Sequence, residues 1–357
     1  MNKECTVSTT YTTDNPLRLI GATGSPYTRK MLSLLRYRRI PHAMIWADPA
    51  AALDGLGISK PKITFLPTFI FKDDSGESEA VCDSTPIIHR LEKLFTPRSV
   101  IPDDPALAFI NFLLEDFGDE WCTKFMFHYR WYFSEDADNA GTQLPLIMDV
   151  TMGEEALQQV KTFFADRQTG RLGYVGSNDT TAPIIDASYR RLLSLLEEHF
   201  KNQPFLLGDK PGSGDFALFG QLSQLIGFDP TPRAIAHKVS PRTIAWVSTL
   251  EDQSGLESEE KNWTSLETVP ATLKNILTEI GRTYVPALLA NAKALQAGEK
   301  QWQTEIDGGL WSQQSFPYQG KCLQWINEEY QNLSQSDKQR VDRLITGTGC
   351  EALLAPH

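Results

Sequence analysis

A strand that turns directly into a helix constrains the fold of this chain most. The apolar residues 17–20 are followed by the sequence GATG (21–24), and helical spacing begins after Ser25 and Pro26. Serine is a favoured N-cap, and proline suits the first helical position because its missing N–H leaves no donor unsatisfied there. The free amides and the positive end of the helix dipole predict an anion-binding site at this turn.

Two motifs compete for the turn. The sequence GATG is similar to the phosphate turn of dinucleotide-binding folds, in which a third glycine lets the helix pack closely on the strand. Here Tyr27 stands at that third position, and no tyrosine is followed four residues later by lysine, as in short-chain dehydrogenases. The other motif is the thioredoxin-like active-site turn C-P-Y-C or its serine variants, which residues 25–28 (SPYT) fit.

Composition indicates a soluble globular protein with a large core and two domains. The chain has 357 residues, of which 41% are hydrophobic and 22% charged. A formal charge of -11 argues against a general nucleic-acid binder, because phosphate neutralisation needs clustered Lys and Arg. No apolar run approaches the length of a membrane span, and the polar residues 1–15 contain no signal-peptide core.

Cysteine and histidine patterns predict neither a disulfide framework nor a metal site. The five cysteines are scattered and lack C-x-x-C spacing, and the six histidines show no paired metal spacing. We therefore expect reduced thiols, no metal and a cytoplasmic location.

Residues 16–95 have the order β-α-β, an irregular connection (50–62), then β-β-α. A strand over 64–71 contains Pro67 near its start, where strands tolerate proline. Leu66-Pro67 is a candidate for a cis peptide bond, which X-Pro adopts at low cost. Asp83 and Ser84 precede an apolar helix and suit its cap.

A proline-containing linker over 95–105 leads into a segment with helical patterns alone. Apolar residues repeat at three- and four-residue spacing from Leu107 to Phe125. Further helices are expected near 153–166, 182–200, 212–226, 241–250, 273–277, 286–297, 322–329 and 336–344. No strand pattern or internal repeat stands out after residue 262.

This organisation resembles the glutathione S-transferase superfamily over residues 16–252. Ser25-Pro26-Tyr27 matches the catalytic turn of its serine-type classes, and Leu66-Pro67 matches its cis-proline. Asp83-Ser84 matches the E/Q-S-x-x-I signature at the γ-glutamyl site. Residues 207–219 match the buried helix start with its capping box, where Gly212 replaces the usual Ser or Thr and Asp215 has a structural role. The last hundred residues and an insert at 136–147 depart from the family pattern.

The resemblance implies a thioredoxin-like α/β glutathione-binding domain at 16–97 and an all-α domain at 104–252. Residues 1–15 form a polar tail, and 253–357 form a further helical extension packed on the helical domain. Ser25 is expected to stabilise the glutathione thiolate, which is the nucleophile. Tyr27 or Thr28 could take this role instead, and a plain N-cap is the alternative for Ser25.

The other ligand contacts follow from the same resemblance. The backbone of Leu66, ahead of Pro67, would hold the cysteinyl unit. Asp83 and Ser84 would hold the γ-glutamyl ammonium and carboxylate, the latter with help from the helix N-terminus. Tyr27 is included among the glutathione-binding residues.

A small electrophilic or hydrophobic second substrate would lie between the domains. His128, Arg130 and Trp131 lie in an aromatic segment (127–133) that could line its site, although aromatic packing is the stronger explanation. The family resemblance also implies a homodimer. The reaction is conjugation, thiolysis or isomerisation; the alternatives are a non-catalytic binding or structural protein on this fold and, on GATG alone, an NAD-dependent reductase.

Overall fold

A four-stranded mixed sheet forms the N-terminal part of the computed structural model, which describes residues 11–73, 75–257 and 262–354. Its strands are β1 (Leu17–Gly21), β2 (His42–Trp46), β3 (Thr68–Lys72) and β4 (Ser78–Cys82), in the order β2-β1-β3-β4. β1 and β2 are parallel, whereas β3 is antiparallel to both β1 and β4. The predicted strand and helix order of this region is confirmed.

Helices α1 (Pro26–Tyr37), α2 (Pro49–Leu56) and α3 (Ser84–Leu94) accompany the sheet. α1 packs against α9 (Ser213–Gly227) at Gly220, where an added Cβ would lie 2.6 Å from the carbonyl oxygen of Pro26. Because only glycine permits this approach, Gly220 fixes the distance between the start of α1 and the helical part. α2 occupies most of the connection at 50–62 that was expected to be irregular.

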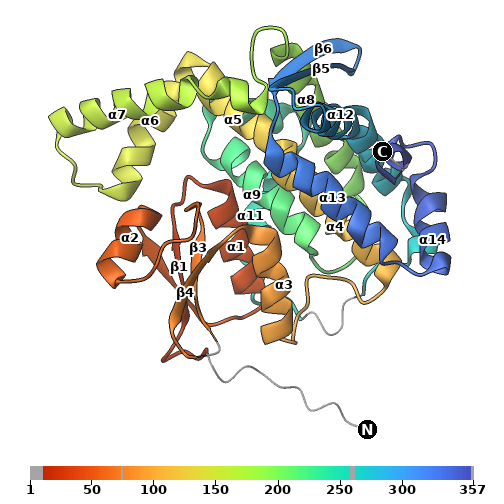
Figure 1. Cartoon of the computed structure of the whole chain (residues 1–357), viewed down its shortest axis with the longest axis horizontal. Helices are drawn as coiled ribbons and strands as arrows, with labels where there is room; N and C mark the ends of the chain where they lie inside the picture. Colours follow the sequence, from red (N-terminus) through yellow and green to blue (C-terminus); the bar gives the residue numbers. More distant parts are fainter. Residues whose placement is uncertain (1–10, 74, 258–261, 355–357) are drawn as a thin grey trace.

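The helical part begins with α4 (Pro105–Glu120) and α5 (Cys122–Tyr132), which divide the predicted apolar helix at Trp121. α6 (Ser134–Met148) and α7 (Glu154–Thr169) project from the body as an arm (Figure 1). A 3-10 turn, η1 (Leu172–Val175), leads to α8 (Ala182–His199), and α9, α10 (Pro230–Val239) and α11 (Pro241–Leu250) complete this part. The predicted insert at 136–147 is thus most of α6, and α10 was not predicted.

Residues 262–354 form an extension that packs on α4 and α8 (Figure 1). It contains η3 (Leu266–Thr268), α12 (Ala271–Gln296), α13 (Pro317–Gln331), α14 (Gln335–Ile345) and η4 (Cys350–Leu354). The expectation of helices alone was wrong in one respect, because β5 (Gln301–Ile306) and β6 (Gly309–Gln314) form an antiparallel hairpin. Its polar residues alternate with buried Trp302, Ile306 and Trp311, and that alternation is typical of a strand pair.

A continuous hydrophobic core joins the sheet, the helical part and the extension. Trp121, Tyr284 and Trp311 meet within it, with ring centroids 5.3 to 6.4 Å apart for Trp121 and each of the other two. We propose to keep the domain boundaries at 97/104 and 252/253, since α3 ends the sheet part and α11 ends the helices that precede the extension.

Candidate functional site

The register of three strands brings the three predicted ligand segments together. Ile20 pairs with Thr68 across β1 and β3, and Thr68 pairs with Cys82 across β3 and β4. The turn at 21–25 follows Ile20, Leu66-Pro67 precedes Thr68, and Asp83-Ser84 follows Cys82. The Leu66-Pro67 peptide bond is cis, as predicted. All three segments therefore lie at the same end of three neighbouring strands, β1, β3 and β4.

Ser25 is the N-cap of α1. Its Oγ accepts a hydrogen bond from the Thr28 N–H (3.3 Å), and Pro26 is the first helical residue. Because capping uses the hydroxyl oxygen as an acceptor, the Ser25 proton is left to donate, and it has no acceptor among the described residues. The N–H of Tyr27 also has no partner within the described ranges. Two donors at the start of α1 are thus open to an anion.

The Tyr27 and Thr28 hydroxyls are both engaged elsewhere. The Tyr27 hydroxyl donates to the Asp119 carbonyl oxygen on α4 (2.9 Å), and burial raises its pKa well above the ordinary value. The Thr28 hydroxyl oxygen accepts from the Ala22 N–H (3.3 Å). The Tyr27 hydroxyl proton is thus used by Asp119, and Tyr27 offers its backbone rather than its phenol. The Thr28 hydroxyl is fully buried, whereas Ser25 is half-buried, so Ser25 is the hydroxyl best placed to donate to a thiolate.

Arg130 holds the turn in place from α5. Its Nη1 donates to the Gly24 carbonyl oxygen (2.8 Å), its Nη2 to Gln224 Oε1 (2.8 Å), and its Nε to Asp229 Oδ1 (2.9 Å). Gln224 in turn donates to the Thr23 carbonyl oxygen (3.2 Å). Burial raises the pKa of Asp229 to about 6, opposed by the adjacent Arg130. Arg130, predicted as a substrate residue, is buried behind the turn and positions it.

His128 and Trp131 also lie inside the helical part. His128 is fully buried, its Nδ1 lies 2.7 Å from Ser177 Oγ, and burial lowers its pKa to about 4. It stacks on Tyr132 with ring centroids 4.6 Å apart. Trp131 is 3% exposed. The aromatic segment therefore serves packing, and the structure does not bring these two side chains to the ligand segments.

Asp83 joins β4 to α3 in an unusual backbone conformation, with φ 88°. Such a φ is rare for a residue with a Cβ and costs of order 1 to 3 kcal/mol, so the surroundings must hold it. Asp83 is the N-cap of α3 but makes no side-chain capping bond. Its Oδ2 instead accepts a hydrogen bond from the Tyr318 hydroxyl on α13 (2.9 Å). Burial raises the pKa of this half-buried carboxyl.

The Ser84 hydroxyl lies in a buried ionic network. Lys30 Nζ donates to Ser84 Oγ (3.0 Å), Glu115 Oε1 (2.9 Å) and Asp119 Oδ2 (2.6 Å), and Lys30 is fully buried. Burial alone would lower the pKa of Lys30, but the two carboxylates raise it instead. The backbone N–H of Ser84, at the start of α3, has no partner among the described residues and is the donor left for a ligand carboxylate.

Sequence reasoning missed Lys30, Gln224, Tyr318 and the acidic face of α4. Four of the six residues at 115–120 are acidic, in a helix that is otherwise mainly apolar. That density was a usable signal, since each of these side chains must find a partner when the helix is buried. The partner Tyr318 lies 235 positions from Asp83, and no local pattern connects the two.

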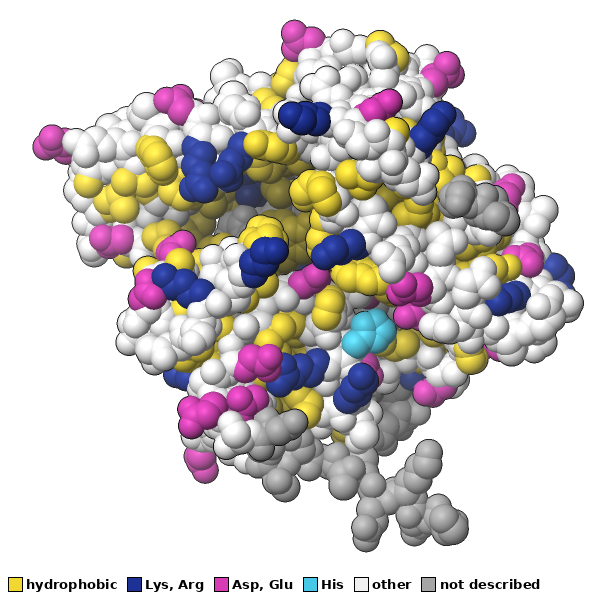
Figure 2. Space-filling view, viewed as in Figure 1, with side chains coloured by type: hydrophobic (Ala, Val, Ile, Leu, Met, Phe, Trp, Pro, Cys, Tyr) yellow, Lys and Arg dark blue, Asp and Glu magenta, His cyan; other side chains and the backbone are white. Residues whose placement is uncertain are grey.

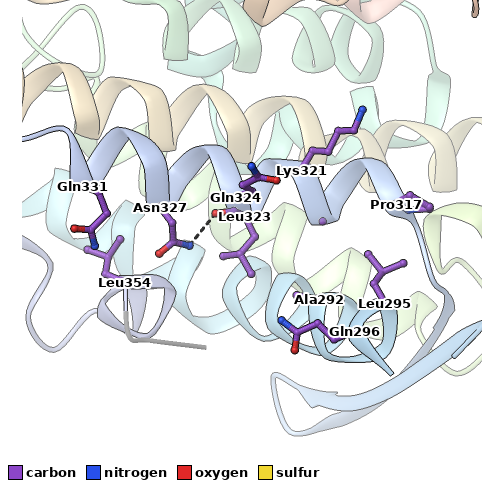
Figure 3. A pocket seen from close by; sticks show the side chains of 11 residues that line it. Ala292, Leu295, Gln296, Pro317, Lys321, Leu323, Gln324, Asn327, Gln331 and Leu354 are labelled. Carbon is purple, nitrogen blue, oxygen red and sulfur yellow. Dashed lines mark hydrogen bonds between the residues drawn. The ribbon is translucent and has the colours of Figure 1, made fainter. Parts of the chain in front are cut away.

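The region around the Ser25 turn is separate from the groove between α12 and α13. The surface is hollowed between the sheet part and the α6–α7 arm, with hydrophobic side chains around the hollow (Figure 2). In α6, Leu144 contacts Gly24, which places this arm beside the Ser25 turn. The groove of about 790 Å³ between α12 and α13 contains none of the ligand segments (Figure 3).

The described residues contain neither a membrane-spanning helix nor a metal-binding cluster. Every described helix is too short or too polar to cross a bilayer. No group of three or more His, Cys, Asp or Glu side chains in the described part is arranged to hold a metal ion.

Comparison with protein families gives two matches in chain order. The model of the glutathione S-transferase N-terminal domain matches residues 19–99, and that of the C-terminal domain matches residues 178–248. These two segments are thus similar to the two domains of glutathione S-transferases, in agreement with the α/β N-terminal and helical C-terminal parts of the fold. No curated protein matches it.

Several solved structures are similar at low sequence identity. FzlA from C. crescentus is 16% identical, with a TM-score of 0.37, over 66% of this chain and 87% of that one. The Tau class glutathione S-transferase of mango is 18% identical, with a TM-score of 0.38, over 69% of this chain and 94% of that one. A glutathione transferase from Burkholderia graminis, which holds two glutathione molecules per subunit, is 17% identical, with a TM-score of 0.38, over 67% and 85%.

Proposed function

We propose that the chain is a glutathione-dependent transferase that activates the glutathione thiol at Ser25. The observation that carries the proposal is the alignment of the 21–25 turn, Leu66-Pro67 and Asp83-Ser84 at the same end of β1, β3 and β4. Similarity to the two domains of glutathione S-transferases supplies the ligand. The cysteinyl unit would lie against the Leu66 backbone, with the γ-glutamyl end at Asp83 and the start of α3.

Ser25 would act by favouring the thiolate. A free thiol has a pKa of about 8.5, and lowering it by two units needs about 2.7 kcal/mol of preferential stabilisation. The open Ser25 hydroxyl and Tyr27 N–H are two donors, and hydrogen bonds to charged groups supply this magnitude. No metal is required for this step.

The second substrate would be a small electrophile in the hollow between the turn and the α6–α7 arm. Hydrophobic side chains, with Lys and Arg side chains among them, lie around that hollow (Figure 2). Leu144 of α6 lies against Gly24 of the turn. An apolar electrophile placed there meets the thiolate while its reacting carbon is shielded from water. A homodimer and a cytoplasmic location remain predictions from the family resemblance.

A non-catalytic binding protein on the same fold is the second candidate. The observation that favours it is that the two residues expected to bind the γ-glutamyl end already have protein partners. Asp83 is hydrogen-bonded to Tyr318, and Ser84 is hydrogen-bonded to Lys30. A ligand that needs either side chain must share it with these partners.

Calorimetric titration with glutathione and, separately, NADH tests the proposal. We expect glutathione to bind with millimolar or better affinity, NADH not to bind, and Asp83→Ala to weaken glutathione binding. Absence of glutathione binding at millimolar concentration would contradict the proposal. Glutathione binding without turnover of a panel of model electrophiles would favour the non-catalytic candidate.

A further inference from the structure

Tyr318 connects the C-terminal extension to the β4–α3 junction. It is the second residue of α13, and its hydroxyl donates to Asp83 Oδ2 at 2.9 Å. Within the described ranges Tyr318 is the side-chain donor that reaches the Asp83 carboxylate, beside the backbone N–H of Thr85. Both side chains are half-buried, so the pair is reachable from solvent, in contrast to the closed network around Lys30.

The charges around this pair favour a cationic ligand group. Around this pair the extension supplies neutral donors: Tyr318 at Asp83, Gln319 at Glu120 (3.3 Å) and Tyr284 at Asp116 (2.6 Å). The remaining acids of α4, Glu115 and Asp119, share Lys30. Asp119 Oδ1 is buried without a hydrogen-bond partner among the described residues. Beside Asp83, the carboxylates of Glu115 and Asp119 thus outnumber the single ammonium of Lys30, a setting that stabilises an added ammonium.

The Tyr318 oxygen is suited to join such a ligand. Its proton goes to Asp83, which leaves its two lone pairs to accept from an N–H donor. Donation to a carboxylate polarises the phenol and strengthens its oxygen as an acceptor. Burial and the adjacent carboxylate raise the pKa of Tyr318, so the phenol stays protonated.

We infer that Tyr318 is a ligand-binding residue that, together with Asp83, receives the primary α-amino group of the γ-glutamyl unit. The inference rests on the proposed function and deepens it, because it makes the extension part of the glutathione site. α13 then has two faces: Tyr318 and Gln319 meet the site, while Lys321, Gln324 and Asn327 line the outer groove (Figure 3). The extension would select for ligands with a free α-amino group.

A comparison of two ligands with three proteins tests this role. Calorimetry measures the binding of glutathione and of des-amino glutathione (glutaryl-cysteinyl-glycine) to the full chain, to Tyr318→Phe and to Tyr330→Phe. Tyr330 is the matched control, because it lies on the same helix and donates its hydroxyl to a carboxylate, Asp342 (2.7 Å). We expect Tyr318→Phe to weaken glutathione binding about tenfold, to leave des-amino glutathione unchanged, and Tyr330→Phe to alter neither.

The other outcomes are distinguishable. Equal weakening of both ligands would show a structural role for Tyr318, and tighter glutathione binding would show that Tyr318 competes with the ligand; either result overturns the inference. An unchanged glutathione affinity in Tyr318→Phe overturns it as well, while the proposed function survives. If the unmodified chain binds no glutathione, the proposed function itself fails. Should Tyr318→Phe fold poorly, Asp83→Asn in the same two-ligand comparison must show the same loss confined to glutathione.

Discussion

The two ends of the candidate site are held in different ways. At the Ser25 end, Arg130 and Gln224 donate to the backbone carbonyls of Thr23 and Gly24, and the groups that face the ligand are an uncharged hydroxyl and an amide. At the Asp83 end, carboxylates crowd around the buried Lys30 ammonium. Hydrogen bonds to the backbone hold the Ser25 end in position. The Asp83 end is instead stabilised by attraction between the Lys30 ammonium and the carboxylates around it. Substitutions and pH should therefore affect the two ends differently.

The largest effect is expected from Lys30→Met at the Asp83 end. The change removes the buried cation that Glu115 and Asp119 share, and breaking a buried pair by removing one partner costs about 3 to 5 kcal/mol. Urea unfolding measures the loss. The matched control is Arg39→Met, whose exposed pair with Glu257 should contribute less than about 1 kcal/mol. Equal effects of the two changes would show that the buried network does not stabilise the Asp83 end.

Rising pH should destabilise the Asp83 end next. Burial raises the pKa of Asp116 to about 7 and that of Glu120 to about 8, each helped by neighbouring carboxylates. The folded protein therefore keeps these two carboxyls protonated at pH values where the unfolded chain, whose carboxyls titrate near pH 4, has lost the protons. The stabilisation of the folded state by these protons is complete below about pH 4 and is lost as pH rises to about 8. Between pH 6 and pH 8 we expect the free energy of unfolding to fall by about 4 kcal/mol, of which Glu120 supplies the larger part.

Two variants locate the source of this pH dependence. Glu120→Gln keeps a polar partner for Gln319 but cannot ionise, so it should flatten the slope between pH 7 and pH 8. The exposed Glu328→Gln should leave the slope as it is. A slope that Glu120→Gln does not change would place the titrating group elsewhere.

At the Ser25 end, Gly220→Ala should cost about 2 kcal/mol of stability, because overpacking forces a backbone shift. The added Cβ would lie 2.6 Å from the Pro26 carbonyl oxygen and 3.0 Å from the Cβ of Lys30. Gly227 on the same helix has no atom within 4 Å of its Cβ position, so Gly227→Ala provides the matched control. Thermal unfolding compares the two variants. Equal melting temperatures would mean that the α1–α9 contact adjusts without strain.

The smallest predicted effect concerns the thiolate. Ser25→Ala should raise the pKa of bound glutathione by about one unit, equivalent to about 1.4 kcal/mol. Tyr27→Phe should leave this pKa unchanged, since its hydroxyl contacts Asp119 on α4. The ultraviolet absorbance of the thiolate, followed against pH, reports both. A shift in Tyr27→Phe but none in Ser25→Ala would transfer the role to the tyrosine.

Local sequence signals predicted the framework of the site well. Ser25 and Pro26 begin a helix because capping and a fixed φ act over a few residues, and the order of elements pointed to Leu66-Pro67 as the cis bond. Asp83 was expected to cap α3, but its carboxylate faces Tyr318 because the extension offers a donor there. A cap predicted from sequence can thus yield to a tertiary contact.

The other differences between the sequence-based predictions and the structure arise from partners that are distant in the sequence or from short, weak patterns. Arg130 was predicted to contact substrate, yet its partners Gly24 and Asp229 lie about a hundred positions away on either side, and no spacing rule connects them. Separate helices were expected near 273–277 and 286–297, but the single helix α12 runs from Ala271 to Gln296 with Pro286 inside it. The β5–β6 hairpin escaped notice because its short strands alternate buried tryptophans with polar residues over only six positions each.

The structure of a glutathione complex tests the central claim most directly. The account predicts one glutathione that spans both ends, with its sulfur within hydrogen-bond distance of Ser25 Oγ and its α-amino nitrogen within about 3.5 Å of Asp83 and Tyr318 oxygens. Glutathione bound with its sulfur remote from Ser25, or its amino group remote from Asp83, would contradict the account.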